Sequence, residues 1–242
     1  YEGNAVAQRA VRLVAESVAS VPLSISDPAL RTLVTATSAG QGLLEALAAH
    51  ILLHGNGYAQ IMRGADGVSA AELYALRPDR VSIVPDACGW PALYRYQTGA
   101  ERRDIAVDGA DGRPNIVHIR AFHPLDDHYG LGCLGAAAQA VAVHNAAARW
   151  NRALLDNGAR PSGALIYDPG DGANLTAEQF DRLKAEMAAA FEGSANAGRP
   201  MLLDGGLKWQ AIGLSPADMD FAGLKEAAAR EIALAFGVPP ML

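Results

Sequence analysis

The residues best suited to chemistry gather around Pro124, where the chain carries a run of side chains that can bind metal ions. Imidazole and carboxylate groups are common ligands of zinc and of harder divalent ions, so this run could form the metal site of an enzyme. Its spacing, however, does not match HExxH or any other helical ligand pair. The alternative is a solvated loop between a strand and a helix. The residues are His118, His123, Asp126, Asp127 and His128.

Two other segments are weak candidates for catalysis. Ser162 lies in a Pro-Ser-Gly sequence and lacks the GxSxG pattern of a nucleophile elbow. Residues 130–135 are rich in glycine, but they lack both the GxGxxG spacing and the strand-and-acid context of a nucleotide site. We therefore predict neither a catalytic residue nor a cofactor, and expect that the chain is not an enzyme.

Composition limits the class of protein further. The 242 residues are 50% hydrophobic and 19% charged, which suits one large or two modest soluble domains. A formal net charge of -6 argues against a surface that grips nucleic acid, although it permits a conduit past which DNA slides. Cys88 and Cys133 are far apart and form no CxxC, so we expect a reducing compartment and no disulfide framework.

Neither a membrane span nor a signal peptide is predicted. The sequence holds no apolar run of the length that crosses a bilayer. It starts at Tyr1 within a helical pattern and not with a signal peptide, so we expect a soluble chain cut from something longer.

The first part of the chain is predicted to be α+β. Apolar periodicity indicates helices over residues 4–21 and 43–55, separated by a polar stretch over residues 24–40. Short links rich in turn residues connect the strands that follow, which favours an antiparallel meander. The expected strands are 58–63, 72–76, 80–84, 92–97, 103–107 and 115–120. The first helix is expected to bury the stripe of Val6, Ala10, Leu13, Ser17 and Val21, widened by Val14 and Val18.

A long helix over residues 131–155 organises the second part. It is rich in alanine, the residue with the lowest cost in a helix, and Gly158 supplies a stop. Because alanine leaves several faces smooth, this helix suits close packing by other helices, either within a monomer or between subunits.

A compact insert follows the long helix. It combines strands over residues 164–167, 201–203 and 207–210 with a helix whose start, Thr176 to Gln179, has capping-box spacing. A last helix starts near Ser215 and stops at Gly237. The insert helix is expected to bury Phe180, Leu183, Met187 and Phe191, and the last helix Phe221, Leu224, Ala228, Ile232 and Phe236.

Several motifs, taken in order along nearly the whole chain, resemble the portal proteins of long-tailed bacteriophages and related gene-transfer agents. The motifs are NGYA at 56–59, LRPDRV at 76–81, DHYG at 127–130, NGARPSG at 157–163, LDGGL at 203–207 and EIALAFGVPP at 231–240. No one motif is decisive, and the resemblance depends on their shared order.

The resemblance implies a portal-like architecture with four parts. An antiparallel, β-rich wing with flanking helices would occupy residues 1–125, and the first of two long stem helices 126–160. These stem helices would bracket a small α/β clip over residues 161–214. Residues 215–242 would form the second stem helix and the start of a truncated tunnel-loop and crown region.

The implied function is that of a head-tail connector. Such a subunit forms a ring of about twelve copies at one capsid vertex, through which double-stranded DNA is packaged and ejected without sequence specificity. The implied partners are the packaging terminase, the head-tail adaptor and the major capsid protein, with no membrane. The implied location is the virion, after assembly in the bacterial cytoplasm.

Hypotheses about individual residues combine this resemblance with side-chain chemistry. Small or apolar residues on the two stem helices would form the subunit interface, basic residues on the last helix would face the DNA channel, and acidic residues on the insert helix would dock partners. The interface set is Ala136, Ala137, Ala140, Val141, Leu224 and Ala228, the channel pair is Lys225 and Arg230, and the docking pair is Glu178 and Asp181.

Two further interpretations remain open beside the portal. The metal-dependent enzyme described above would carry stoichiometric metal. A simple interaction scaffold would use Phe180, Phe191 and Trp209 of the insert to bind a partner and could stay monomeric. A portal should instead form large closed rings.

Overall fold

A computed structural model of the chain describes residues 1–38, 40–65, 69–156, 163–168, 175–191, 207–211 and 221–240. It divides into two compact units, one made of residues 1–141 and 229–242 and the other of residues 142–228. Helices α4 (Cys133–Asp156) and α6 (Phe221–Ala235) each contribute residues to both units. The α+β class predicted from the sequence is confirmed.

Helices α1 (Ala5–Ser20), α2 (Pro28–Thr35) and α3 (Leu43–His54) belong to the first unit. Asn4 caps α1 by accepting a hydrogen bond from the Ala7 amide at 2.9 Å, and Gly55, with φ of 75°, ends α3 in the left-handed conformation. The first and third helices confirm the predictions. The second corrects the prediction of a polar stretch, because Asp27 caps a helix that Pro28 starts.

Two antiparallel three-stranded sheets follow the short pair β1 (Thr37–Ser38) and β2 (Gln41–Gly42). One sheet has the order β4-β3-β8, and the other has the order β5-β6-β7, preceded by the 3₁₀ turn η1 (Pro78–Arg80). The strands are β3 (Asn56–Arg63), β4 (Ala70–Leu76), β5 (Val81–Pro85), β6 (Pro91–Thr98), β7 (Glu101–Ala106) and β8 (Ile116–Arg120). The predicted meander is therefore wrong in two respects: β4 and β5 belong to different sheets, and β8 returns to pair with β3 and not with β7.

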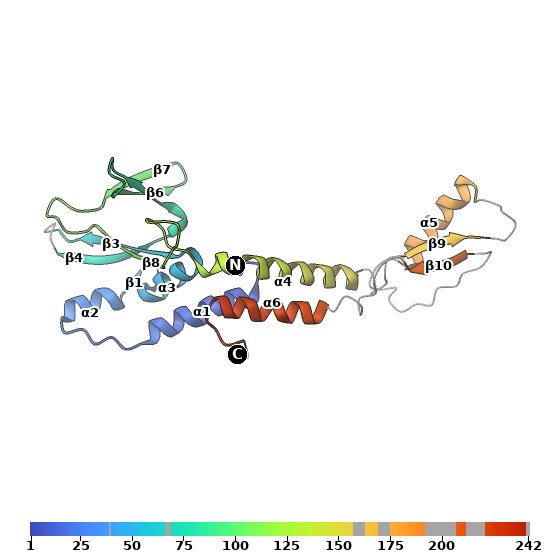
Figure 1. Cartoon of the computed structure of the whole chain (residues 1–242), viewed down its shortest axis with the longest axis horizontal. Helices are drawn as coiled ribbons and strands as arrows, with labels where there is room; N and C mark the ends of the chain where they lie inside the picture. The colour runs from blue at the N-terminus through green and yellow to red at the C-terminus, as the bar shows by residue number, and fades with distance from the viewer. Residues whose placement is uncertain are drawn as a thin grey trace. The chain divides into compact units, whose positions relative to one another are not determined.

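The two sheets form two layers, and α3 lies on the outer side of the β4-β3-β8 layer (Figure 1). Between the layers, Tyr58, Leu76 and Ile116 of one sheet pack with Val81, Tyr94 and Ile105 of the other. We call these six residues the sheet cluster. On the opposite face of β3, Ala59 packs against Leu43 and Leu47 of α3. The central strand β3 is thus covered on both faces.

A second core, the helical cluster, joins α1, the first part of α4 and the last part of α6. Small side chains dominate it, which lets the helix backbones approach closely. Its buried residues are Ala7, Ala10, Val11, Ala137, Ala140, Ile232, Ala233, Phe236 and Val238. Of the predicted α1 stripe, Ala10 is buried and Val6, Leu13 and Val14 are partly buried, but Val18 and Val21 are exposed.

The second unit contains the described part of the insert. Strand β9 (Gly163–Tyr167) pairs antiparallel with β10 (Leu207–Ala211), and α5 (Ala177–Phe191) lies between them in the sequence. The capping box is confirmed: the Thr176 amide donates to Gln179 Oε1 at 3.0 Å, and the Gln179 amide donates to Thr176 Oγ1 at 3.3 Å.

Part of the insert prediction needs correction, and part falls beyond the described residues. Phe180 is 57% exposed, so its predicted burial on the stripe of α5 is wrong. The strand expected over residues 201–203, the stop at Gly158 and the helix start at Ser215 lie outside the described residues. Among the helices that are described, none has the length and apolar character needed to cross a membrane.

Candidate functional site

Two of the potential metal ligands around Pro124, Asp126 and His123, are engaged in local hydrogen bonds. Asp126 Oδ1 accepts from the amides of His128 and Tyr129 at 2.7 and 2.8 Å, and those bonds lower the pKa of the Asp126 carboxyl. His123 Nδ1 accepts from the Leu125 amide at 3.1 Å. In the described parts of the chain, no three His, Cys, Asp or Glu side chains come together as a metal site. The geometry does not support the enzyme interpretation.

His118, the remaining member of that run, lies in β8, as its alternation with Val117 and Ile119 predicts. Its ring stacks on Tyr58 with centroids 4.3 Å apart, and its Nε2 lies 3.0 Å from Asn56 Oδ1. Burial lowers the pKa of His118 to about 4, and the nearby charge of Arg120 adds to this shift. The imidazole is therefore neutral at pH 7 and donates one N–H to Asn56.

Asn56 is the centre of a buried polar network that the sequence did not reveal. This side chain is 5% exposed, and its Oδ1 also accepts from the Gly130 amide at 2.8 Å. Its Nδ2 donates to the His54 carbonyl at 2.9 Å and, more weakly, to the Gly130 carbonyl at 3.4 Å. We call this the Asn56 junction. It joins the end of α3, strands β3 and β8, and the segment before α4.

Glycines permit the close approach at this junction. A Cβ on Gly130 would lie 2.0 Å from the Gly55 carbonyl oxygen, and one on Gly132 would lie 2.5 Å from the Leu53 carbonyl oxygen. Backbone atoms cannot yield as a flexible side chain can, so only glycine fits. Nearby, the Tyr129 hydroxyl accepts from the Ile83 amide at 2.8 Å, and the Arg120 guanidinium donates to the Asp127 carbonyl. These contacts fix where α4 begins.

The predicted subunit-interface residues divide into buried and exposed groups. Ala137 and Ala140 are 2% and 6% exposed and belong to the helical cluster of their own chain, and Ala228 is also buried. Ala137 and Ala140 thus pack within the chain's own helical cluster, and the role of all three residues in a subunit interface stays a prediction. Ala136 and Leu224 are exposed, and Val141 is partly buried. Leu224 thus departs from the buried face predicted for the last helix, which Ala228, Ile232 and Phe236 confirm.

The charged candidates lie at the surface of the second unit and of α6. Glu178 and Asp181 are exposed on α5, Arg230 is exposed, and Lys225 is partly buried. Burial, together with the Lys225 charge, lowers the pKa of His144. The roles of these four residues in docking and in a DNA channel stay predictions.

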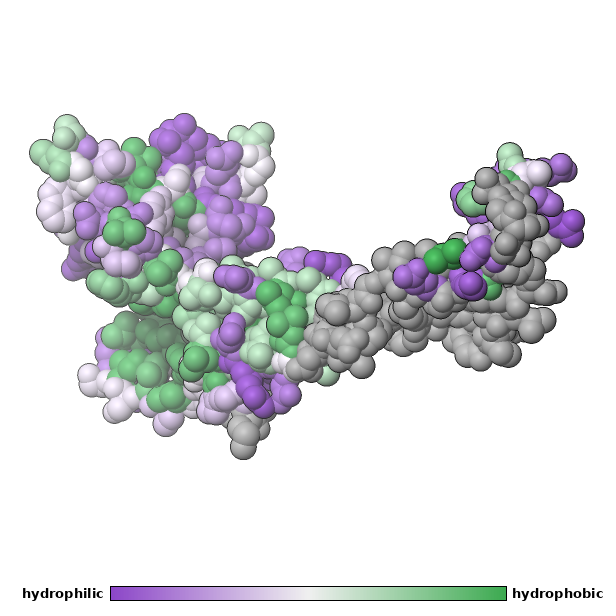
Figure 2. All heavy atoms as spheres, turned by 45° about the vertical axis from the view of Figure 1, so that its right-hand side comes forward, coloured by the Kyte–Doolittle hydropathy of each residue, from purple (hydrophilic) through white to green (hydrophobic). Residues whose placement is uncertain are grey.

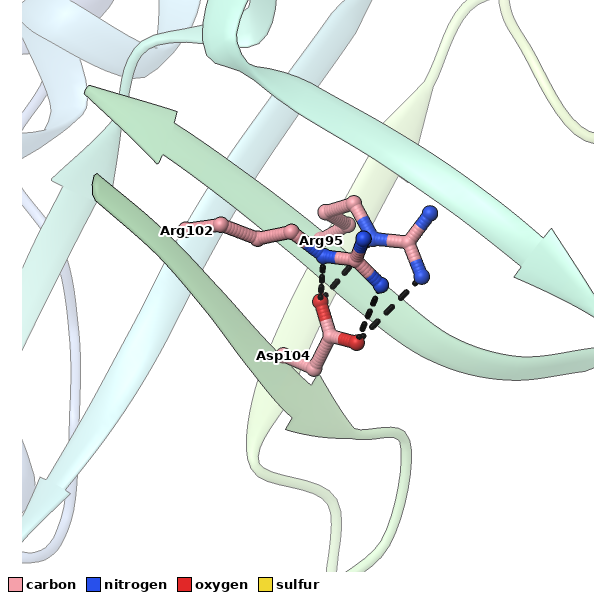
Figure 3. A network of polar contacts seen from close by, with 3 residues as sticks. All are labelled: Arg95, Arg102 and Asp104. Carbon is pink, nitrogen blue, oxygen red and sulfur yellow. Dashed lines mark hydrogen bonds and ion pairs between the residues drawn. The ribbon is translucent and has the colours of Figure 1, made fainter. Parts of the chain in front are cut away.

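A surface network on β6 and β7 was also missed. Asp104 lies between Arg95 and Arg102 (Figure 3) and accepts from Arg95 Nε at 2.9 Å and from Arg102 Nη2 at 3.0 Å. These bonds, from Arg102 first and Arg95 second, hold the pKa of the Asp104 carboxyl far below its usual range. The sequence does contain a signal for this network. Arg102 and Asp104 are two residues apart on one strand and so share a face, and Asp104 pairs directly with Arg95 on the next strand.

Beside this network lies a shallow cleft of about 280 Å³ between β3 and β7, which includes Gln60, Arg63, Arg103 and Asn115. Arg63 is paired with Asp111 at 3.3 Å. The ion pairs around the cleft are partly exposed to solvent, which weakens their contribution to stability.

The fold is a mixture of helices and antiparallel sheets, and the polar networks described above join its helices and strands. Residues 5–242 match the family described as phage portal protein, and the chain belongs to that family.

Individual relatives agree with this family. A protein of Rickettsia felis is 39% identical over 254 residues, covering all of this chain, while the chain spans 65% of that relative's length. The probable portal protein of Streptomyces phage phiC31 is 26% identical, with 96% of this chain and 53% of that protein covered. A chain in the neck of a native gene transfer agent particle, solved with C12 symmetry, is 52% identical with a TM-score of 0.70, covering 100% of this chain and 67% of that one.

Proposed function

We propose that this chain acts as a structural portal subunit that forms a ring, with about twelve copies, at one vertex of a phage-like particle. The ring would pass double-stranded DNA during packaging and ejection and would serve as a docking platform. Its partners would be a packaging terminase, a head-tail adaptor and the major capsid protein. In this proposal, the protein assembles in the bacterial cytoplasm, has no catalytic activity and ends in the neck of the virion.

One observation carries the proposal. The chain is similar over its whole length, at 52% identity, to a chain found in the neck of a gene transfer agent particle with C12 symmetry. Identity at this level, together with the family match over residues 5–242, supports a shared role. Fold similarity alone would not suffice, because one fold can host many functions.

The charge distribution supports passage of DNA over tight binding. The net charge is -6, and on α6 the basic Lys225 and Arg230 stand among acidic neighbours such as Glu226 and Glu231. Affinity for duplex DNA depends mainly on neutralising phosphates, so few uncompensated cations mean weak, salt-sensitive contact. Lys225 and Arg230 would face the channel in this proposal.

Negative-stain electron microscopy of the purified protein tests the ring directly. We expect closed rings with a central opening, and a matching mass by mass photometry. A protein that stays monomeric at micromolar concentrations, with its circular dichroism spectrum intact, would contradict the proposal. Stoichiometric metal in elemental analysis would instead revive the enzyme interpretation.

The insert is proposed to dock the packaging motor and the tail adaptor through the exposed face of α5. Glu178 and Asp181 are exposed there, so exchanging both for lysine should change stability by no more than about 0.5 kcal/mol. Glu178→Lys with Asp181→Lys should preserve rings but reduce DNA packaging or tail joining in vitro. The matched isosteric variant, Glu178→Gln with Asp181→Asn, should lose less. Normal packaging by the lysine variant would argue against this docking face.

A further inference from the structure

The edge of one sheet and the loop that continues it expose large apolar side chains. Strand β8 is an outer strand of the β4-β3-β8 sheet, as the described residues show it. Val117 pairs with Ala59 and Ile119 with Gly57, so both side chains lie on the face that α3 covers, yet both remain exposed. Directly after β8, Phe122 is 84% exposed and Leu125 is 91% exposed. We call these four residues the apolar edge. Figure 2 shows one face of the described residues, on which apolar surface, in green, reaches solvent.

The backbone around the apolar edge is held in place by hydrogen bonds on both sides. Before Phe122, the Ala121 amide donates to the Gly55 carbonyl at 2.8 Å. After Leu125, Asp126 Oδ1 accepts from the amides of His128 and Tyr129, and the Gly130 amide donates to Asn56 Oδ1. Between them, the Leu125 amide donates to His123 Nδ1. Phe122 and Leu125 are therefore exposed on a loop whose backbone is held in one conformation. Such a loop loses little further conformational entropy when it binds a partner.

Such a surface is unusual for a sheet edge. Proteins commonly protect an outer strand with charges, proline or a covering element, because exposed apolar edges attract other chains. Here Val117 and Ile119 remain exposed on the face that carries α3, and the loop adds a phenylalanine and a leucine. Clustered exposed apolar side chains often mark protein–protein contact sites, where phenylalanine is enriched. The apolar edge thus has the composition of a contact surface.

We propose that the apolar edge is a contact between adjacent subunits, in which Phe122 and Leu125 of one copy pack into a surface of the next copy. This inference rests on the proposed function, because the 52% identical chain belongs to a neck with C12 symmetry. In a cyclic ring the contact is heterologous, so each subunit presents one surface to one neighbour and a different surface to the other. The small, fixed apolar edge suits this arrangement, because its contribution to the binding free energy is repeated at every interface of the closed ring.

Replacing both apolar tips tests the contact. In the complete protein, Phe122→Ser with Leu125→Ser should raise the subunit concentration at half assembly by about tenfold or more, as measured by mass photometry. The variant subunit should retain its circular dichroism spectrum and urea midpoint, because neither side chain is buried. Trp90→Ser is the matched control, since Trp90 is 73% exposed in the turn between β5 and β6 and should leave assembly unchanged. Equal assembly of the double variant and the control would overturn the proposal.

Cross-linking gives a second measurement that does not depend on the stability of the double variant. Leu125→Cys is introduced with Cys88→Ser, because Cys88 is exposed, and the Cys88→Ser protein alone sets the background from Cys133. A short thiol-to-amine cross-linker should produce covalent dimers and higher species within assembled rings. Absence of these species in intact rings would refute the contact while leaving the portal function in place. If the parent protein forms no rings, both the portal function and this inference fall.

Discussion

The sheet cluster and the helical cluster hold the same unit together by different means. The sheet cluster relies on large side chains: the rings of Tyr58 and Tyr94 pack in a T-shaped arrangement with centroids 5.9 Å apart, and Tyr58 also stacks on His118. The helical cluster relies on small ones, with Ala7, Ala10 and Ala137 among its buried members. Large side chains contribute through the area that they bury, whereas alanines contribute by letting backbones meet. The first core should therefore suffer most from truncation and the second from enlargement.

Truncation in the sheet cluster should produce the largest effect. Tyr58→Ala removes a ring that is 1% exposed, and aromatic-to-alanine changes in cores cost about 3–5 kcal/mol. Urea unfolding followed by circular dichroism should show this loss of unfolding free energy. Tyr74→Ala, at a partly exposed position of the neighbouring β4, is the control and should cost far less. Similar losses at both positions would mean that the sheet cluster is not a distinct core.

Enlargement in the helical cluster should have the next largest effect. Ala137→Leu forces extra volume between α1, α4 and α6, and overpacking typically costs about 1–3 kcal/mol. Ala136→Leu, one residue earlier and exposed, should change stability by less than about 0.5 kcal/mol. The difference between the two urea midpoints measures how tightly the helices pack. Tolerance of leucine at Ala137 would show that this core is loose.

A dependence of stability on pH should arise beside the sheet cluster, because His118 stacks on its member Tyr58. The pKa of His118 is about 4 in the folded protein, lowered by burial, against an ordinary value near 6.5 for the unfolded chain. Between these values the unfolded state binds more protons, so stability falls as the pH drops from about 6.5 towards 4. Because His118 is only partly buried, we expect a loss of about 1 kcal/mol at pH 5.

His118→Gln should flatten that dependence while retaining a donor towards Asn56. His50, whose pKa burial also lowers to about 4, contributes in the same direction and provides the residual slope. None of the nine residues of the helical cluster is titratable, so this cluster should add nothing to the dependence of stability on pH. An unchanged pH profile in the glutamine variant would exclude His118 as its source.

The smallest expected effect is a gain in stability. The Tyr58 hydroxyl is buried and, as far as the described residues show, lacks a hydrogen-bond partner, and burial raises its pKa. An unsatisfied buried hydroxyl is costly, so Tyr58→Phe should be neutral or stabilising by up to about 1 kcal/mol. Urea midpoints of the two proteins settle the sign. A clear loss would reveal a partner for the hydroxyl.

Local patterns in the sequence were enough to predict many of the helices and strands. The capping box of Thr176 and Gln179 is a short-range pattern, and the bonds that it predicts are present. Alternating strands of β-branched and aromatic residues were likewise recognisable, because period and turn residues are local properties. The helix α2 was missed since its Ser- and Thr-rich surroundings concealed the cap at Asp27.

Long-range contacts explain what the sequence could not show. The return of β8 to β3 depends on strand pairing across the chain, and no local pattern specifies the partner. The buried face of α1 differs from the predicted stripe. The prediction followed the large valines, whereas close packing of the helices buries Ala7, Val11 and Ala15 on another face. Ala137 and Ala140 looked like interface residues for the same reason: small side chains favour close contact, but do not say with which helix.

The Asn56 junction also has a consequence for the order of folding. Asn56 and Gly130 are 74 residues apart in the sequence, so their hydrogen bond closes a long loop. Asn56 Oδ1 also accepts from His118, which requires β8 to have found β3. Such distant contacts form slowly compared with helical turns. We therefore expect α4 to become helical early but to acquire its fixed attachment only when the sheet is complete, so that hydrogen exchange at Gly130 reports the last step of folding.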